Sequence, residues 1–328
     1  MREKDKLERQ LENYADVFAD IVNVLLFDGE RKVDPENLND KAPRSTYKGD
    51  GRLFDQERDE AKYWIVDDVA YALVGLENQS DMSTYMPIRT IGYDGADYRH
   101  QIRILDDAKR EFCKEKKRRK AAGDASAETM TFDPPPMYPV VTIVLYFGTD
   151  RWTAPQTLKE SITIPEGFDS YVNDYRINLF EIAWLSDETI AKFKSDFRYV
   201  AELTKQGRLL AEKKITHINL TEIELRHARE TLDLLYAMTG DRRFKEAMNE
   251  IARGRKVNMF AAFDIYETRG REAGLKEGRK EGRAKERVNT ERERKRADAA
   301  EARAEQAETE NQKLKEQIAA LQQTVHQQ

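Results

Sequence analysis

The chain has 328 residues, of which 36% are charged, and its formal net charge is −5. This length allows one large domain or two smaller ones. The mean hydropathy is −0.81, and no apolar run approaches the roughly 20 residues that span a bilayer. The sequence also begins without an apolar signal region. We therefore expect a cytoplasmic protein with no membrane segment. The single cysteine, Cys113, excludes an internal disulfide framework.

The first predicted element is an amphipathic helix. Apolar residues recur at spacings of three and four from Leu7 to Leu25, which predicts a helix with one apolar face that ends at Asp28 and Gly29. Asp20 lies off that face. The following segment, 31–51, is rich in Pro, Asn and Asp, and we expect a loop there with at most a short strand.

A β-hairpin follows the loop. Residues 61–66 (AKYWIV) and 69–76 (VAYALVGL) each predict a strand, with a tight turn between them. If the turn is centred near Asp68, Asp59 lies opposite Glu77, and residues opposite each other in an antiparallel pair share a face. Gln79 shares the face of Glu77, because side chains alternate along a strand. We therefore expect Asp59, Glu77 and Gln79 to converge at the open end of the hairpin, with Asp55 as the alternative first acid.

This group of side chains predicts a metal site. A buried charge is costly unless it is paired or bound to a metal, and Glu77 directly follows an apolar run. Mg²⁺ is commonly held by one or two carboxylates together with water and substrate phosphates. Such an ion generates a hydroxide nucleophile and stabilises the charge on a phosphate that is being hydrolysed. The alternative for Glu77 and Gln79 taken alone is a hairpin that simply ends in polar residues.

Residues 86–108 predict a helix, and a basic run follows it. Arg89 and Tyr93 are candidates to contact a substrate phosphate, with packing or surface roles as the alternative. Residues 109–120 contain eight Lys or Arg and two Glu, a local charge of +6. Such cations supply sequence-independent affinity for DNA, and the alternative is a solvated loop. The expected DNA contacts in this run are Lys116, Lys117, Arg118 and Arg119.

The later part of the chain completes a sheet and then becomes helical. Residues 140–147 are apolar on both faces, which is typical of a strand in the middle of a covered sheet. Residues 178–182 predict a further strand, and from Ser186 onward the pattern is almost entirely helical. The expected fold is therefore α/β, with a core at 1–185 built on a small mixed sheet and a helical region at 186–266 packed on that core.

The C-terminal tail has a different character. Residues 267–296 contain twelve Lys or Arg and seven Glu, with glycine at every fourth position from Gly270 to Gly282, and predict a charged arm that either follows DNA or stays solvated. From 297 to 328 apolar residues step by three and four, with Asn311 at heptad position a and Leu314 at position d. This pattern favours a parallel two-stranded coiled coil, and hence a homodimer. A solvated single helix is the alternative.

Several of these segments resemble a known nuclease family. An acid, a hairpin and then Glu77-Asn78-Gln79 look like the core motif of the PD-(D/E)XK nucleases. Together with 86–94 (MPIRTIGYD) and 139–148 (PVVTIVLYFG), this motif resembles the recombination-promoting nuclease family, whose members also carry the label transposase. The resemblance covers roughly residues 13–264.

The resemblance implies a restriction-endonuclease-like core and a Mg²⁺-dependent DNA endonuclease that acts in recombination or transposition. Asp59 and Glu77 would hold the metal, Asp20 from the preceding helix would be a third ligand, and Gln79 would position the attacking water. The chain departs from the motif at Arg58, where the family has proline, and at Gln79, where it has lysine. Two alternatives therefore stay open. One is a DNA-binding protein with the same fold and a weakened site, and the other is a scaffold protein that works through its coiled coil.

Overall fold

The structure is a computed structural model. It describes residues 3–252 except positions 42, 43, 50, 51, 58, 68, 219 and 221–223, together with scattered positions between 279 and 315. The chain divides into two units, Met1–Val257 and Asn258–Gln328. The heptad positions of the expected coiled coil, from Ala297 to Val325, all lie outside the described residues.

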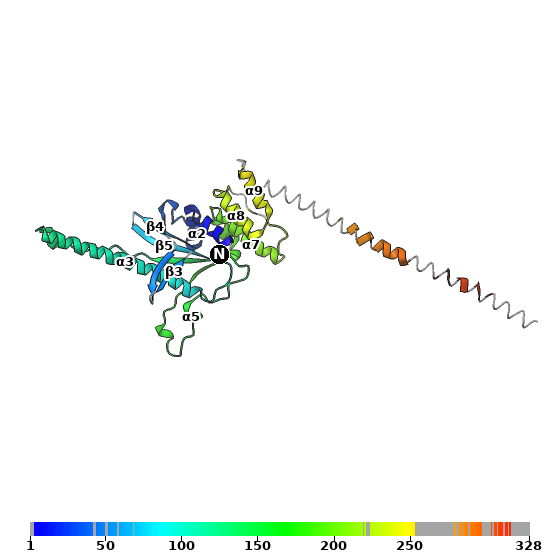
Figure 1. The fold of residues 1–328 in the computed structure, drawn as a ribbon, viewed down its shortest axis with the longest axis horizontal. Helices are drawn as coiled ribbons and strands as arrows, with labels where there is room; N and C mark the ends of the chain where they lie inside the picture. Colours follow the sequence, from blue (N-terminus) through cyan, green and yellow to red (C-terminus); the bar gives the residue numbers. More distant parts are fainter. Residues whose placement is uncertain are drawn as a thin grey trace, which may run out of the picture. The chain divides into compact units, whose positions relative to one another are not determined.

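A five-stranded mixed sheet organises the first unit (Figure 1). In order across the sheet, its strands are β1 (Leu38–Asp40), β4 (Glu60–Val66), β5 (Val69–Gln79), β6 (Val140–Tyr146) and β7 (Asn178–Glu181). β1, β4 and β5 are antiparallel neighbours, whereas β5, β6 and β7 run parallel. A separate hairpin pairs β2 (Arg44–Gly49) with β3 (Arg52–Glu57). The α/β class and the interior position of β6, between β5 and β7, are therefore as predicted.

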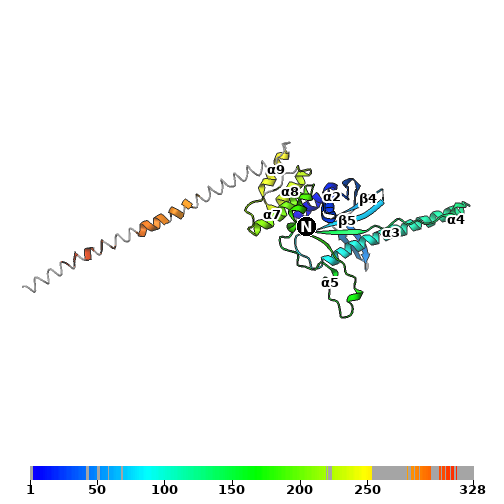
Figure 2. The ribbon, with the colours of Figure 1, turned by 180° about the vertical axis from the view of Figure 1, so that it is seen from behind.

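Helices cover both faces of the sheet. The helices are α1 (Glu3–Glu12), α2 (Ala15–Phe27), α3 (Met86–Ala121), α4 (Ser126–Thr129), α5 (Leu158–Ser161), α6 (Asp187–Lys192), α7 (Phe197–Ala211), α8 (Ala228–Thr239) and α9 (Arg242–Ala252), with short 3-10 turns at Pro35–Asn37, Asp169–Tyr171 and Ile182–Trp184. α3 connects the parallel strands β5 and β6 and lies on one face, while α2, α7 and α8 lie on the other (Figure 2). No helix within the described ranges has the length and apolarity needed to cross a membrane.

Alternation along β6 shows how the two faces are filled. Val144 and Tyr146 pack with Met86, the first residue of α3, and with Trp152. Phe147, just past the end of β6, points the other way, and its ring centroid lies 6.4 Å from that of Phe197 at the start of α7. Side chains of successive residues in a strand point to opposite faces, so one apolar strand contributes to two layers of core.

Polar side chains hold α3 on the sheet. The hydroxyl of Thr142 on β6 donates to buried Asp94, at 2.6 Å. The Gln101 amide exchanges two hydrogen bonds with the backbone of Tyr138, at 3.0 and 3.1 Å. These contacts fix the register of the helix against the strand that follows it in the chain.

α3 is longer than the sequence pattern predicts. It continues beyond residue 108 to Ala121, so the basic run 109–120 is helical rather than a loop. The extension carries pairs between residues three or four apart, such as Lys114 with Glu111 and Arg119 with Glu115, which support a helix. Phe112 also packs on Phe132, with ring centroids 5.5 Å apart, so the returning chain covers part of the helix.

The N-terminal helix differs from the prediction, because it is broken in two. The apolar spacing continues across residues 13 and 14, yet Tyr14 has an extended backbone with φ −67° and ψ 128°. Two tertiary contacts account for the break. The Tyr14 ring stacks on His227 at 3.6 Å, and the Asn13 side chain accepts a hydrogen bond from Lys62 at 3.1 Å.

The helical region after the sheet begins at α6, as the pattern from Ser186 predicts. The Ser186 hydroxyl caps α6 by accepting from the backbone N–H of Thr189 at 3.0 Å. Gly240 ends α8 in the left-handed conformation, with φ 69°. Leu232 and Leu235 of α8 are fully buried, so this helix belongs to the core of the first unit.

Candidate active site

The β4–β5 hairpin brings Asp59 beside Glu77. The ladder pairs Val66 with Val69 at the turn and Glu60 with Leu76 at the open end, and a bulge between Trp64 and Ile65 shifts the register by one residue. The next pair outward would be Asp59 and Glu77. The pairs next to the turn are shifted by one residue from those that a turn centred at residue 68 would give. The bulge compensates for this shift, so the pairs at the open end match the prediction.

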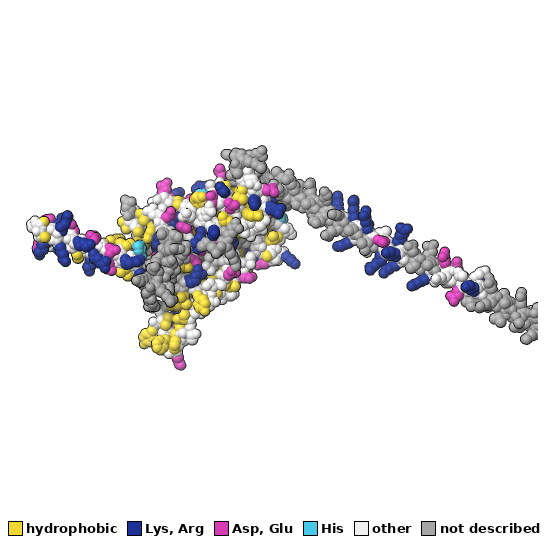
Figure 3. Space-filling view, in the orientation of Figure 1, with side chains coloured by type: hydrophobic (Ala, Val, Ile, Leu, Met, Phe, Trp, Pro, Cys, Tyr) yellow, Lys and Arg dark blue, Asp and Glu magenta, His cyan; other side chains and the backbone are white. Residues whose placement is uncertain are grey.

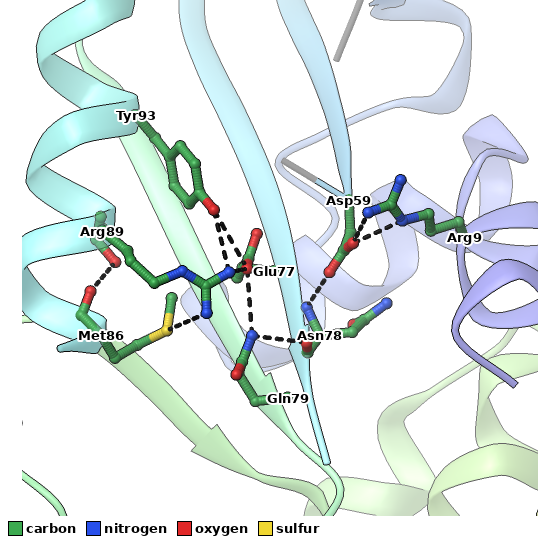
Figure 4. A network of polar contacts seen from close by, with 9 residues as sticks. Arg9, Asp59, Glu77, Asn78, Gln79, Met86, Arg89 and Tyr93 are labelled. Atoms are coloured by element: carbon green, nitrogen blue, oxygen red, sulfur yellow. Dashed lines mark hydrogen bonds and ion pairs between the residues drawn. The ribbon is translucent and has the colours of Figure 1, made fainter. Parts of the chain in front are cut away.

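Glu77 is a buried carboxylate beneath the first turns of α3 (Figure 4). It is 2% exposed, and its Oε1 accepts hydrogen bonds from the Arg89 guanidinium, from the Tyr93 hydroxyl at 3.5 Å and from the Gln79 amide at 3.2 Å. Burial and the Glu77 charge raise the pKa of Tyr93. Burial alone would lower the pKa of Arg89, but Glu77 and Tyr93 raise it overall. Glu77 therefore sits as a charged partner of Arg89.

Asp59 is held by a different arginine. Its Oδ1 accepts from Nε of Arg9, on α1, at 2.6 Å, and its Oδ2 accepts from the backbone N–H of Asn78 at 2.7 Å. The two carboxylates are thus neighbours on the hairpin but turn to opposite sides of β5 (Figure 4). Arg9 compensates one of them and Arg89 the other.

A second pair of acids lies on the Asn78 side of β5. Asn78 donates through its side chain to Glu12 of α1 at 2.7 Å. Glu12 is 1% exposed, and burial, followed by the nearby charge of Glu8, raises its pKa well above the ordinary value. Burial likewise raises the pKa of Glu8 to about 7, and the Lys4 ammonium, 3.3 Å away, opposes that rise.

The sequence did not single out these two acids. Glu8 and Glu12 are four residues apart, so they share a helix face, and each directly follows an apolar residue of the stripe, Leu7 or Leu11. This proximity to the buried stripe is the signal that could have marked them.

The remaining predicted site residues lie elsewhere. The Asp20 carboxylate accepts from the backbone N–H groups of Lys194 and Ser195, both at 2.7 Å, so it holds the linker before α7 and is not grouped with Glu77. Asp55 lies in β3, where the structure describes the backbone alone.

The predicted DNA contacts lie on the second half of α3, which projects from the sheet and carries Lys and Arg along its surface (Figure 3). The Lys116 ammonium donates to the Met130 carbonyl at 2.8 Å, and Arg118 and Arg119 both pair with Glu115. Lys117 is exposed.

The donor chemistry at the hairpin end suits a hard cation. Carboxylate and amide oxygens are ligands that Mg²⁺ accepts, with water completing its shell. Among the residues that the structure describes, however, no three His, Cys, Asp or Glu side chains are grouped as ligands of one metal ion. Because Asp59 and Glu77 each contact an arginine, a cation would bind there only in exchange for such a contact.

Comparisons with protein-family models, with curated proteins and with solved structures found no match for this chain.

Proposed function

We propose that the chain is a metal-dependent DNA endonuclease, with a restriction-endonuclease-like core similar to that of the recombination-promoting nucleases. The observation that carries this proposal is Glu77, a carboxylate that is 2% exposed at the end of a central strand. It has Asp59 beside it on the hairpin, Gln79 two residues on, and Arg89 above it. A buried carboxylate that is surrounded by other polar and charged side chains is a candidate for a functional site.

Glu77 would hold the divalent cation, and Asp59 would join it after turning away from Arg9 and the Asn78 N–H. The cation would supply an activated water and neutralise charge on the scissile phosphate. Gln79 would orient that water. Its amide lies 3.2 Å from Glu77 Oε1, on the same face of β5. An amide adds no positive charge, so more of the charge stabilisation falls to the cation and to arginine.

Arg89 is the residue suited to bind the phosphate. Its side chain is 40% exposed, whereas that of Glu77 is only 3% exposed, so the guanidinium reaches from the buried acid to the surface. The planar fork of an arginine matches two phosphate oxygens. When Arg89 moves from Glu77 to a phosphate, the carboxylate becomes available to a cation, so substrate and metal would bind together.

Two basic segments would supply the wider DNA contacts. One is the second half of α3, with Lys117 exposed near its end. The other belongs to the second unit, where the described residues Arg292, Arg294 and Lys295 are helical and exposed. Contacts of this kind bind the backbone of any DNA sequence.

A plasmid-nicking assay with and without Mg²⁺ tests the proposal. Wild-type protein should nick only with the cation, and Glu77→Gln, which keeps the shape but removes the charge, should abolish nicking. Glu188→Gln, on the exposed start of α6, is the matched control and should retain full activity. Equal nicking by wild-type and folded Glu77→Gln protein would contradict the assignment.

The second candidate is a DNA-binding protein of the same fold whose site no longer cuts. The arginine contacts of both carboxylates and the Gln79 amide in place of a lysine favour it. Saturable DNA binding without nicking, in Mg²⁺ or Mn²⁺, would select this candidate over the endonuclease.

A further inference from the structure

A pocket distinct from the candidate active site lies between α2, the loop that follows it and the segment joining α6 to α7. Its volume is about 320 Å³. The charged residues of its lining are Asp16, Asp20, Arg31, Lys192, Lys194 and Arg226. Neither Asp59 nor Glu77 contributes to it.

Cations from three separate segments of the chain meet in this pocket. Arg31 comes from the loop after α2, Lys192 and Lys194 from the end of α6 and the residues after it, and Arg226 from the residues before α8. The lining holds two acids, both on α2, so its formal charge is positive.

Both acids already have partners. The Asp20 carboxylate accepts two backbone hydrogen bonds, from Lys194 and Ser195. The Asp16 carboxylate contacts Nε2 of His227 at 2.8 Å and Nη1 of Arg226 at 3.6 Å. The carboxylates therefore need no further cation.

The cations of the pocket have fewer or more exposed ionic partners than its two acids. Lys194 is exposed, and within the described part of the chain its ammonium has no hydrogen bond or ion pair. Arg31 pairs with Asp34 at 2.9 Å, and Lys192 with Asp28, but the Arg31 side chain is 75% exposed and that of Asp28 is 87% exposed. Exposed pairs of this kind contribute little and exchange readily for a stronger anion.

One of these cations is also held in place. The aliphatic stem of Lys192 lies over Gly29, where an added Cβ would meet its Cδ at 3.1 Å. Gly29 itself has φ +88°, a conformation that favours glycine. The turn that ends α2 therefore leaves the space that Lys192 occupies beside the pocket.

We propose that this pocket binds a small phosphate-bearing molecule of the size of pyrophosphate or a nucleoside diphosphate. Its volume is at the lower end of the range of about 300–1,000 Å³ typical of small-molecule sites. Arginine and lysine together supply the charge-assisted hydrogen bonds that phosphate oxygens prefer. A concave site formed by three segments suits a compact ligand better than the continuous backbone of a duplex. This inference does not depend on nuclease activity.

Calorimetric titration of the full-length protein with inorganic pyrophosphate, at low salt and without divalent cations, tests the proposal. We expect saturable binding of one ligand per chain. Lys194→Ala and Arg31→Ala, each at an exposed position, should weaken it about 10-fold or more, as expected for a lost charge-assisted hydrogen bond. Arg103→Ala on α3 removes an exposed cation that does not line the pocket and should leave binding unchanged.

Three results would overturn the proposal. One is no saturable binding at millimolar pyrophosphate. Another is equal affinity in wild-type protein and in the double variant Lys194→Ala with Arg31→Ala. The third is displacement of pyrophosphate by a short DNA duplex that itself loses affinity in that variant, because the pocket would then be a DNA backbone contact.

Discussion

At the scale of single residues, two arginines set the charge balance of the candidate active site. Arg89 contacts Glu77 from above β5, and Arg9 contacts Asp59 from α1. Glu77 is buried with almost no access to water, so its negative charge depends on the guanidinium beside it. The pairs Arg89–Glu77 and Arg9–Asp59 stabilise the free protein. A substrate and a cation would have to break these same pairs in order to bind.

Removing Arg89 tests this dependence. Arg89→Ala should lower the free energy of unfolding at neutral pH by about 1–3 kcal/mol, less than for a fully buried pair because the arginine is partly exposed. In a Glu77→Gln background the same substitution should cost much less. Urea denaturation of the wild type, the two single variants and the double variant gives the interaction free energy between Arg89 and Glu77. Arg110→Ala, which breaks an exposed pair with Asp107, is the control, and equal losses in both backgrounds would contradict the expected coupling.

Glu8 predicts a pH dependence of stability. Its pKa rises from 4.5 to about 7 in the folded protein because the side chain is buried. Between these values the folded chain holds a proton that the unfolded chain releases, so stability is full below pH 4.5 and falls as the pH rises through about 7. The effect amounts to at most about 3 kcal/mol.

Glu8→Gln keeps a neutral side chain at every pH. The variant should gain stability relative to wild type at pH 8 and show little difference at pH 4, measured by thermal or urea unfolding at both values. Glu111→Gln, on the exposed surface of α3, is the control. A difference between variant and wild type that does not change with pH would show that Glu8 keeps its charge in the folded protein.

At the scale of elements, the sequence was sufficient wherever a short-range pattern determined the structure. The strands β4, β5, β6 and β7 follow runs of apolar residues. The pairing at the open end of the hairpin matched a centre at residue 68 only because a bulge between Trp64 and Ile65 offsets the tighter turn. The pattern placed Gln79 with Glu77, but the expected convergence of Asp59 with them was wrong, because Asp59 turns to the other side of β5, towards Arg9.

The parts that could not be predicted depend on contacts between distant segments. Arg9 reaches Asp59 across 50 positions in the chain, and Glu12 reaches Asn78 across 66. The break at Tyr14 arises from a ring that belongs to the far end of the unit, His227. No periodicity in a single stretch encodes such pairings, so both the second arginine and the acids of α1 were missed.

Gly148 shows how one short segment after β6 is constrained. A Cβ at this position would overlap the hydroxyl and ring of Tyr146, which packs edge-on against Trp152 with centroids 5.1 Å apart. Gly148→Ala should therefore displace a buried ring and destabilise the protein by about 1–3 kcal/mol. Gly95→Ala on α3, where nothing lies within 4 Å, is the matched control and should stabilise the helix by roughly 0.5–1 kcal/mol. Chemical denaturation of both variants checks the contrast, and a neutral Gly148→Ala would show that the Tyr146 ring moves freely.

At the scale of the whole molecule, the net charge of −5 does not describe how charge is distributed. Residues 109–120 carry +6 and residues 267–296 carry +5, so the remainder of the chain is strongly acidic. Cations that suit a nucleic acid therefore gather in two segments, one in each unit. If the chain binds DNA as proposed, a second copy would add further basic segments and hence further phosphate contacts on the same duplex.

The last prediction is a homodimer held by residues 311–325, whose seam positions Asn311, Leu314, Ile318, Leu321 and Val325 lie outside the described part of the chain. A seam of two apolar positions per heptad cannot be buried by one helix, and a parallel pair would align Asn311 with its own copy. Sedimentation of the full-length protein at micromolar concentration should show a dimer, and a chain ending at Arg296 should show a monomer. Leu314→Glu with Leu321→Glu should also give a monomer, whereas Gln312→Glu with Gln323→Glu adds the same charge away from the seam and should leave the dimer intact. A dimer that survives the truncation would locate the interface before residue 297, and a full-length monomer would mean that the heptads form no coiled coil.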